Sequence, residues 1–172
     1  FREGGVREPF VISWPGTIAP GRVLDDPVIT VDLYRTLIGL AGGAAPQSPV
    51  PFDGTDLMPL LSGTGAIAER DLFWAGRICN PKKGCVDSGA LRRGRWKLLI
   101  ESGGKAKLFD LAADPSEKRN VAGANPAVYD AMNKRYVGWK ATLPSNASGE
   151  AGKPRPANGK AKRSRREQDG DG

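Results

Sequence analysis

The chain has 172 residues and a formal net charge of +7, with 26 Lys and Arg against 19 Asp and Glu. This length suits one domain of ordinary size, and no stretch approaches the ~18 apolar residues of a membrane-spanning helix. Histidine is absent, which excludes a His-based metal centre within the chain, and two cysteines alone fall short of the four ligands that zinc usually takes.

The first sixteen residues are expected to form a turn and a short strand, followed by residues that end the strand. Glu3–Pro9 contains two adjacent glycines among alternating charges, which predicts a tight turn. Within this turn, Arg7 is interpreted as an ion-pair partner of Glu3 or Glu8. Phe10–Ile12 is a short apolar run that predicts a strand, and the Trp-Pro-Gly sequence that follows ends it.

A helix is predicted next, over Val28–Leu40. Its apolar residues recur at helical spacing on one face, at Val31, Tyr34, Leu37, Ile38 and Ala41. Gly42 and Gly43 would supply its C-terminal cap. After a proline-rich loop, the run from Asp53 to Gly63 predicts a turn into a short helix that ends at the glycine.

Residues 70–111 change to short apolar runs separated by tight turns, which predict an antiparallel meander of three or four strands. The runs are Asp71–Trp74, Ala90–Leu91, Trp96–Ile100 and Leu108–Leu111. A long helix follows, with Asn125 as its predicted N-cap, Pro126 at its first position and Pro144 at its end. Its apolar stripe is expected to cover one face of the meander and comprises Val128, Met132, Tyr136, Trp139 and Leu143.

Two further features stand apart from these elements. Cys79 and Cys85 are six positions apart and could close a small loop as a disulfide or remain free thiols. The tail over residues 145–172 holds seven Lys and Arg against four Asp and Glu, and its Gly, Pro and Ser content predicts solvated disorder. A second hypothesis is a polyanion-binding module that uses this tail. Nucleic acid is not an expected partner, because no aromatic side chain lies among these charges to stack on bases.

Several short sequence blocks carry a family resemblance through their order along the chain. They are Glu3-Gly-Gly-Val-Arg-Glu-Pro9 with Trp14-Pro-Gly16, Asp32-Leu-Tyr-Arg-Thr-Leu37 with Leu40-Ala-Gly42, Asp53-Gly-Thr-Asp-Leu57 with Pro59-Leu-Leu61, Arg70-Asp-Leu-Phe-Trp74, Arg92–Leu98, and Leu108-Phe-Asp-Leu111 with Asp114-Pro-Ser-Glu117 and Asn120. Together they resemble the C-terminal segments of the sulfatases, in the alkaline-phosphatase-like superfamily. Arg35 departs from that pattern, which has proline there.

The resemblance implies an α/β parent fold of the alkaline-phosphatase-like type. This chain would contribute a strand and a helix of the large sheet plus a small antiparallel sheet packed by a long helix, so the fragment alone should be α+β. Residues 1–63 would end the sulfatase α/β domain, residues 64–144 would form the antiparallel subdomain, and residues 145–172 would be the basic tail. The implied partners are the N-terminal part of the same domain and a sulfated small molecule or sugar.

The resemblance also implies sulfate-ester hydrolysis in the intact enzyme, with phosphate or phosphonate ester hydrolysis as the alternative. Sulfatases are understood to use calcium and a formylglycine made within Cys/Ser-x-Pro-x-Arg. The run Cys79-Asn-Pro-Lys-Lys83 lacks the arginine and lies far downstream, so it is not interpreted as the nucleophile. The loop pair Asp25-Asp26 is not interpreted as a metal site. No catalytic residue and no metal ligand is therefore assigned, and the fragment alone is expected to be inactive.

The candidate substrate-binding residues are three cations in the loop after the first strand of the meander. Arg77, Lys82 and Lys83 could form part of the rim of the substrate site and meet an anionic sulfated sugar there. Solvated surface is the alternative interpretation of the same charges. The family resemblance alone suggests a periplasmic, secreted or lysosome-like compartment.

Overall fold

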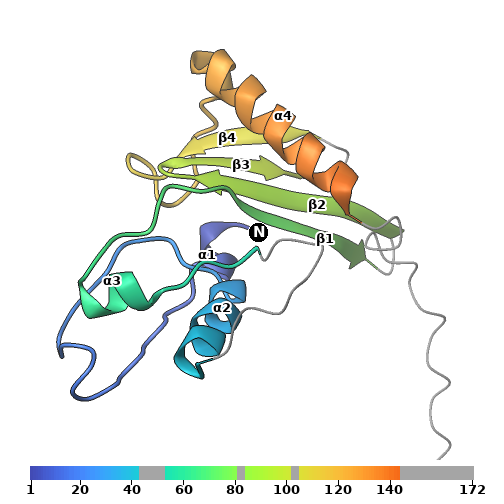
Figure 1. The fold of residues 1–172 in the computed structure, drawn as a ribbon. Coiled ribbons are helices and arrows are strands. Elements are labelled where there is room, and N and C mark those ends of the chain that lie inside the picture. Colours follow the sequence, from blue (N-terminus) through green and yellow to red (C-terminus); the bar gives the residue numbers. More distant parts are fainter. Residues whose placement is uncertain (43–52, 81–83, 102–104, 144–172) are drawn as a thin grey trace, which may run out of the picture.

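A computed structural model describes residues 1–42, 53–80, 84–101 and 105–143, and its main feature is a four-stranded antiparallel sheet (Figure 1). The strands pair in chain order and are β1 (Leu72–Asn80), β2 (Gly84–Arg93), β3 (Trp96–Ile100) and β4 (Ala106–Asp110). The register places Leu91 opposite Leu98, and Leu98 opposite Leu108. The predicted meander is therefore confirmed, and β1 and β2 extend further than the apolar runs alone indicated.

One face of the sheet is covered by α4 (Pro126–Thr142), which follows a short 3-10 turn, η1 (Ala122–Ala124). Met132 and Tyr136 are buried against Leu91, Leu98 and Leu108. The rings of Phe73 and Trp139 stack at 4.5 Å between their centroids. The predicted helix and its packing face are thus confirmed.

The start of α4 differs from the prediction in one detail. Asn125 occupies the N-cap position, but its side chain makes no capping hydrogen bond and donates instead to the carbonyl of Val121 at 3.1 Å. The backbone N–H of Asn125 also bonds to Val121, at 3.1 Å. The asparagine side chain therefore holds η1 against the helix start rather than capping the helix.

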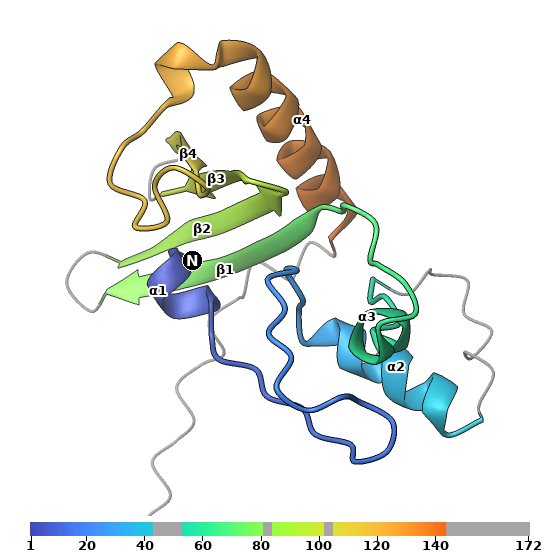
Figure 2. The same ribbon diagram turned by 90° about the vertical axis from the view of Figure 1, so that its left-hand side faces the viewer.

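The opposite face of the sheet is covered by the beginning of the chain (Figure 2). Phe1 packs against a second buried cluster formed by Ala90, Leu99 and Phe109. A single helical turn, α1 (Glu3–Val6), follows where a glycine turn was predicted. Because side chains alternate along a strand, these two coverings bury side chains on both faces of the central strands β2 and β3.

Phe10–Ile12 does not form the predicted strand. No backbone hydrogen bond joins Phe10–Ser13 to another segment within the described residues. A strand requires a neighbour that accepts and donates its ladder hydrogen bonds, and the described part of the chain provides none beside this segment. Here Phe10–Ile12 runs through a long connection between α1 and α2.

The remaining helices, α2 (Val31–Leu40) and α3 (Met58–Ser62), lie apart from the sheet (Figure 1). The helix α2 begins three residues later than predicted, and Gly42 follows it with a φ of +70°, as a glycine cap requires. Its buried side chains are polar, Asp32 and Thr36, whereas most of its predicted apolar face is exposed. No helix among the described residues has the length and apolar character needed to cross a membrane.

Candidate functional site

A fully buried lysine joins the N-terminal segment to the sheet. Lys97 lies on β3, on the face covered by the N-terminal segment. Its Nζ atom is 2.7 Å from Glu3 Oε1 and 3.0 Å from Glu117 Oε1. A buried ammonium requires such partners, because removing a charge from water is costly unless an opposite charge and hydrogen bonds replace the solvent. Lys97, Glu3 and Glu117 are called the Lys97 cluster below.

Three further contacts hold the Lys97 cluster in place. The backbone N–H of Glu3 donates to Glu117 Oε2 at 2.7 Å. Arg92, opposite Lys97 in the β2–β3 register, has a guanidinium nitrogen 3.5 Å from Glu3 Oε2. Arg2 donates to the Glu117 carbonyl at 3.1 Å. Glu117 also adopts a φ of +53°, a conformation that is unusual for a non-glycine residue and that these contacts hold in place.

The predicted ion pair of Arg7 is therefore wrong. The Glu3 side chain points into the Lys97 cluster, where a buried lysine competes for it, and neither Arg7 nor Glu8 has an ion pair among the described residues. Sequence reasoning treated Glu3 as part of a glycine turn. A lysine inside the apolar run of β3 was the available signal that a buried partner had to exist.

A second charged cluster fixes α2 to the segment before β1. The Arg70 guanidinium donates two hydrogen bonds to the Asp32 carboxylate, one of them 2.6 Å from Nη1 to Oδ1. The backbone N–H groups of Ile29 and Thr55 also donate to Asp32, each at 2.9 Å. The Thr36 hydroxyl oxygen accepts from the backbone N–H of Leu57 at 2.9 Å. These contacts explain why the buried side of α2 is polar.

The electrostatics of Asp32 follow from these contacts. Burial raises the pKa of the Asp32 carboxyl, because it disfavours the charged form. The Arg70 guanidinium and the two backbone donors oppose burial and prevail, so the pKa lies below its usual value. Asp32 therefore stays ionised at neutral pH and serves as a structural anchor rather than as a proton donor.

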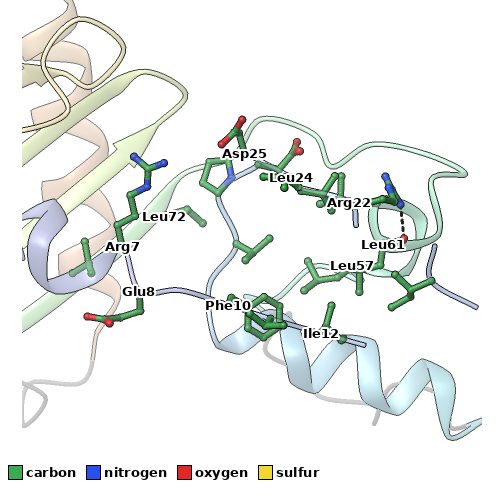
Figure 3. A pocket seen from close by; sticks show the side chains of 18 of the residues that line it. Arg7, Glu8, Phe10, Ile12, Arg22, Leu24, Asp25, Leu57, Leu61 and Leu72 are labelled. Atoms are coloured by element: carbon green, nitrogen blue, oxygen red, sulfur yellow. Dashed lines mark hydrogen bonds between the residues drawn. The ribbon is translucent and has the colours of Figure 1, made fainter. Parts of the chain in front are cut away.

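An open groove of about 1360 Å³ lies between the N-terminal connection, α3 and the sheet (Figure 3). Apolar residues line much of it, among them Phe10, Ile12 and Leu57. Arg7 and Arg22 bring positive charge to it, and the Arg22 guanidinium donates to the Leu61 carbonyl. Acidic side chains line the groove as well, among them Glu8.

The structure does not test the prediction that Arg77, Lys82 and Lys83 form part of the rim of the substrate site. Arg77 lies on β1 opposite Asp87 of β2, and Lys82 and Lys83 fall outside the described residues. Asp25 and Asp26 line the groove, and no group of three metal-binding side chains occurs in the described part of the chain.

The structure gives the backbone position of the two cysteines and describes no residue of the basic tail. The backbone register places Cys79 directly opposite Cys85, and both the disulfide and the free-thiol interpretation stay open. The tail over residues 145–172, with the polyanion-binding hypothesis that depends on it, lies outside the described residues.

Both charged clusters are made by residues of the sequence blocks described above. Glu3, Lys97 and Glu117 come from three blocks, and Asp32 and Arg70 come from two others. These contacts join blocks that are far apart in the chain, and the order of the blocks indicates a sulfatase C-terminal segment as the class of protein. The family model described as "N-sulphoglucosamine sulphohydrolase, C-terminal" matches residues 1–137, and the chain belongs to this sulfatase family.

Individual relatives agree with this assignment. Human arylsulfatase A is 37% identical over 158 residues, which cover 77% of this chain and 30% of the relative. Mouse steryl-sulfatase is 41% identical over 78 residues, covering 45% of this chain and 12% of the relative. The chain thus spans less than a third of the length of these curated proteins.

Solved structures support the fold. The crystal structure of Ps i-CgsB in complex with k-i-k-neocarrahexaose matches with a TM-score of 0.63 at 25% identity, over 73% of this chain and 27% of that one. The putative sulfatase yidJ from Bacteroides fragilis matches with a TM-score of 0.52 at 23% identity, over 75% of this chain and 28% of that one, which shows the fold alone. The predicted fold class, an α+β fragment of an alkaline-phosphatase-like parent, is confirmed.

Proposed function

We propose that this chain is the C-terminal part of an enzyme that hydrolyses sulfate esters. The observation that carries the proposal is that the residues of the sulfatase sequence blocks form the two buried charged clusters. These clusters join blocks that are far apart in the chain, and the blocks lie within the residues that the sulfatase family model matches. The names of its relatives, arylsulfatase A and steryl-sulfatase, support the same reaction class.

In this proposal the chain contributes the fold and part of the substrate rim, while the rest of the enzyme contributes the chemistry. The described residues do not fit a calcium site, because no three candidate ligands lie together. By the family resemblance, the formylglycine and the calcium would be held by the N-terminal part. Arg77, Lys82 and Lys83 stay proposed as rim cations for a sulfated small molecule or sugar, since cations at the mouth of a site raise the local concentration of anionic substrate.

The test is a fusion of the full 172-residue chain to the part of human arylsulfatase A that precedes the matched region. The fusion is expressed in cells that mature sulfatases and assayed with p-nitrocatechol sulfate, beside the chain alone. We expect hydrolysis by the fusion and none by the chain. A fusion that unfolds cooperatively but hydrolyses no p-nitrocatechol sulfate would contradict the proposal.

The rim residues are tested separately within the same fusion. Replacing Arg77, Lys82 and Lys83 by Ser should raise KM for a sulfated oligosaccharide while leaving kcat nearly unchanged, because these cations would bind substrate without touching the reacting atoms. Replacing Lys118, Arg119 and Lys134 by Ser is a control with the same change of charge at exposed positions elsewhere. An equal KM in the two triple variants would remove the rim assignment.

A further inference from the structure

The far end of the β1–β2 hairpin extends beyond the rest of the sheet (Figure 1). The two strands pair down to Asn80 opposite Gly84, whereas β3 pairs with β2 only as far as Gly89. Residues 76–80 and 84–88 therefore form a two-stranded ribbon with no third strand beside it in the described part of the chain. They are called the hairpin extension below. A two-stranded ribbon by itself is only marginally stable in water, so a link across it would strongly affect its order.

The hairpin extension brings the two cysteines of the chain together. Cys79 lies directly opposite Cys85, and the pairs on both sides continue the same register. Residues directly opposite in an antiparallel pair share a face of the sheet, and their Cα atoms are about 4.5 Å or about 5.5 Å apart, depending on the kind of pair. A disulfide joins residues whose Cα atoms are about 4.4–6.8 Å apart. Either kind of pair therefore allows a disulfide without movement of the backbone.

Buried side chains at the other end of the hairpin fix the register that aligns the cysteines. The β1–β2 pairing is one-to-one from Leu72 to Asn80, so no bulge separates the two ends. Leu72 is buried on β1, and Ala90 and Leu91 are fully buried on β2. A slip of one residue would move these side chains to the opposite face of the sheet. The core packing therefore requires Cys79 to meet Cys85 rather than a neighbour of Cys85.

We propose that Cys79 and Cys85 form a cross-strand disulfide that holds the hairpin extension together, an inference that does not depend on the proposed function. The two cysteines are six positions apart, and closing a loop of this length favours the ordered ribbon over its opened state by about 50-fold in the chain-entropy model. A contact from α4 also reaches the extension, with Lys140 Nζ 3.2 Å from Asp87 Oδ2. Partly exposed ion pairs contribute little, so the disulfide is the stronger constraint.

The bond forms by thiol–disulfide exchange with a small disulfide such as oxidised glutathione. The thiolate of one cysteine attacks a glutathione sulfur, the S–S bond of the glutathione disulfide breaks, and one glutathione thiolate leaves. The thiolate of the second cysteine then attacks the protein sulfur of this mixed disulfide and releases the second glutathione. Two cysteine thiols are oxidised, one glutathione disulfide is reduced to two thiols, and the two protons of the cysteines pass to the released glutathione.

The first experiment compares disulfide formation in the folded and the unfolded full chain. Both are equilibrated with the same mixture of reduced and oxidised glutathione, one without denaturant and one in concentrated urea. Free thiols are then alkylated and counted by intact mass, which separates the linked chain from the dithiol because the chain has two cysteines. We expect the ratio of disulfide to dithiol to be about 10- to 100-fold higher in the folded chain, because the fold favours the bond by the factor by which the bond favours the fold.

Three results of this comparison overturn the proposal. The first is an equal ratio in the two conditions, since the fold would then not align the cysteines. The second is a folded chain that carries a separate glutathione on Cys79 and on Cys85. The third is a disulfide-linked dimer, seen on a non-reducing gel, in place of the linked monomer.

A second experiment tests whether the bond holds the hairpin extension together. In the full chain, reduction should speed exchange of the hydrogen-bonded amides in residues 77–79 and 85–87 by about 10-fold or more and leave the amide of Leu98, on β3, unchanged. The double variant Cys79→Ser with Cys85→Ser is the matched control, and its exchange should equal that of the reduced chain with or without reductant. An unchanged rate on reduction of the unsubstituted chain, or a response to reductant in the double variant, overturns the proposed role of the bond.

Discussion

Replacing Lys97 by Met tests whether the Lys97 cluster holds the N-terminal segment to the sheet. Methionine keeps the length and apolar stem of lysine but removes the charge. Lys97 is fully buried, and its two partners, Glu3 and Glu117, are nearly so. The substitution therefore leaves two carboxylates without the ammonium that compensates them.

The expected loss follows from that geometry. Breaking a buried ion pair by removing one partner costs about 3–5 kcal/mol. Glu117 would keep the backbone N–H of Glu3 at 2.7 Å, and Glu3 would keep Arg92 at 3.5 Å, so the lower end, about 3 kcal/mol, is expected. At an m-value of about 1–3 kcal/mol per M, the urea midpoint should fall by about 1–3 M.

The assay is urea unfolding of the full chain at pH 7, followed by tryptophan fluorescence and far-UV circular dichroism. Lys107→Met is the matched control, because Lys107 forms a partly exposed pair with Glu101 at 2.7 Å and exposed pairs contribute about 0–1 kcal/mol. Adding Glu117→Gln to Lys97→Met should cost nothing more, since it removes an uncompensated charge. If Lys97→Met shifts the midpoint no further than Lys107→Met, the cluster does not anchor the segment.

Three further predictions concern other contacts. Because the pKa of Asp32 is lowered in the folded state, the stability from its carboxylate should be present above about pH 4 and be lost as the pH falls through the folded pKa. In urea unfolding between pH 6 and pH 3, Asp32→Asn should therefore lose less stability than the unsubstituted chain. Gly89→Ala should lower stability by about 1–3 kcal/mol, since its Cβ would lie 1.9 Å from the Tyr136 hydroxyl and 2.7 Å from the Trp74 carbonyl, and an unchanged Tm would contradict that packing. Gly138→Ala on α4 meets open space and should raise stability by about 1 kcal/mol in the same thermal assay.

The two clusters also hold separate segments of this chain together. The Lys97 cluster ties the first residues of the chain to the central strand β3, and the Asp32–Arg70 pair ties α2 to the segment that enters β1. Each cluster joins residues 38 or more positions apart in sequence. Buried charges therefore help to fix the positions of both segments.

The sequence by itself determined the elements whose signals are local. The meander followed from short apolar runs between turns, and α4 followed from a stripe at helical spacing ended by proline, since both patterns need only neighbours along the chain. The order of the family blocks likewise gave the assignment to the sulfatases, which the comparisons confirmed.

Only the tertiary structure decided what the charged block residues do. Nothing local to Glu3 indicates a partner 94 positions away, and Asp32 on a helix with an apolar stripe gave no sign that the polar side would be the buried one. The segment Phe10–Ile12 had the composition of a strand, but the described part of the chain places no strand beside it. Pairing of this kind depends on which surfaces meet in space, and a one-dimensional pattern does not carry that information.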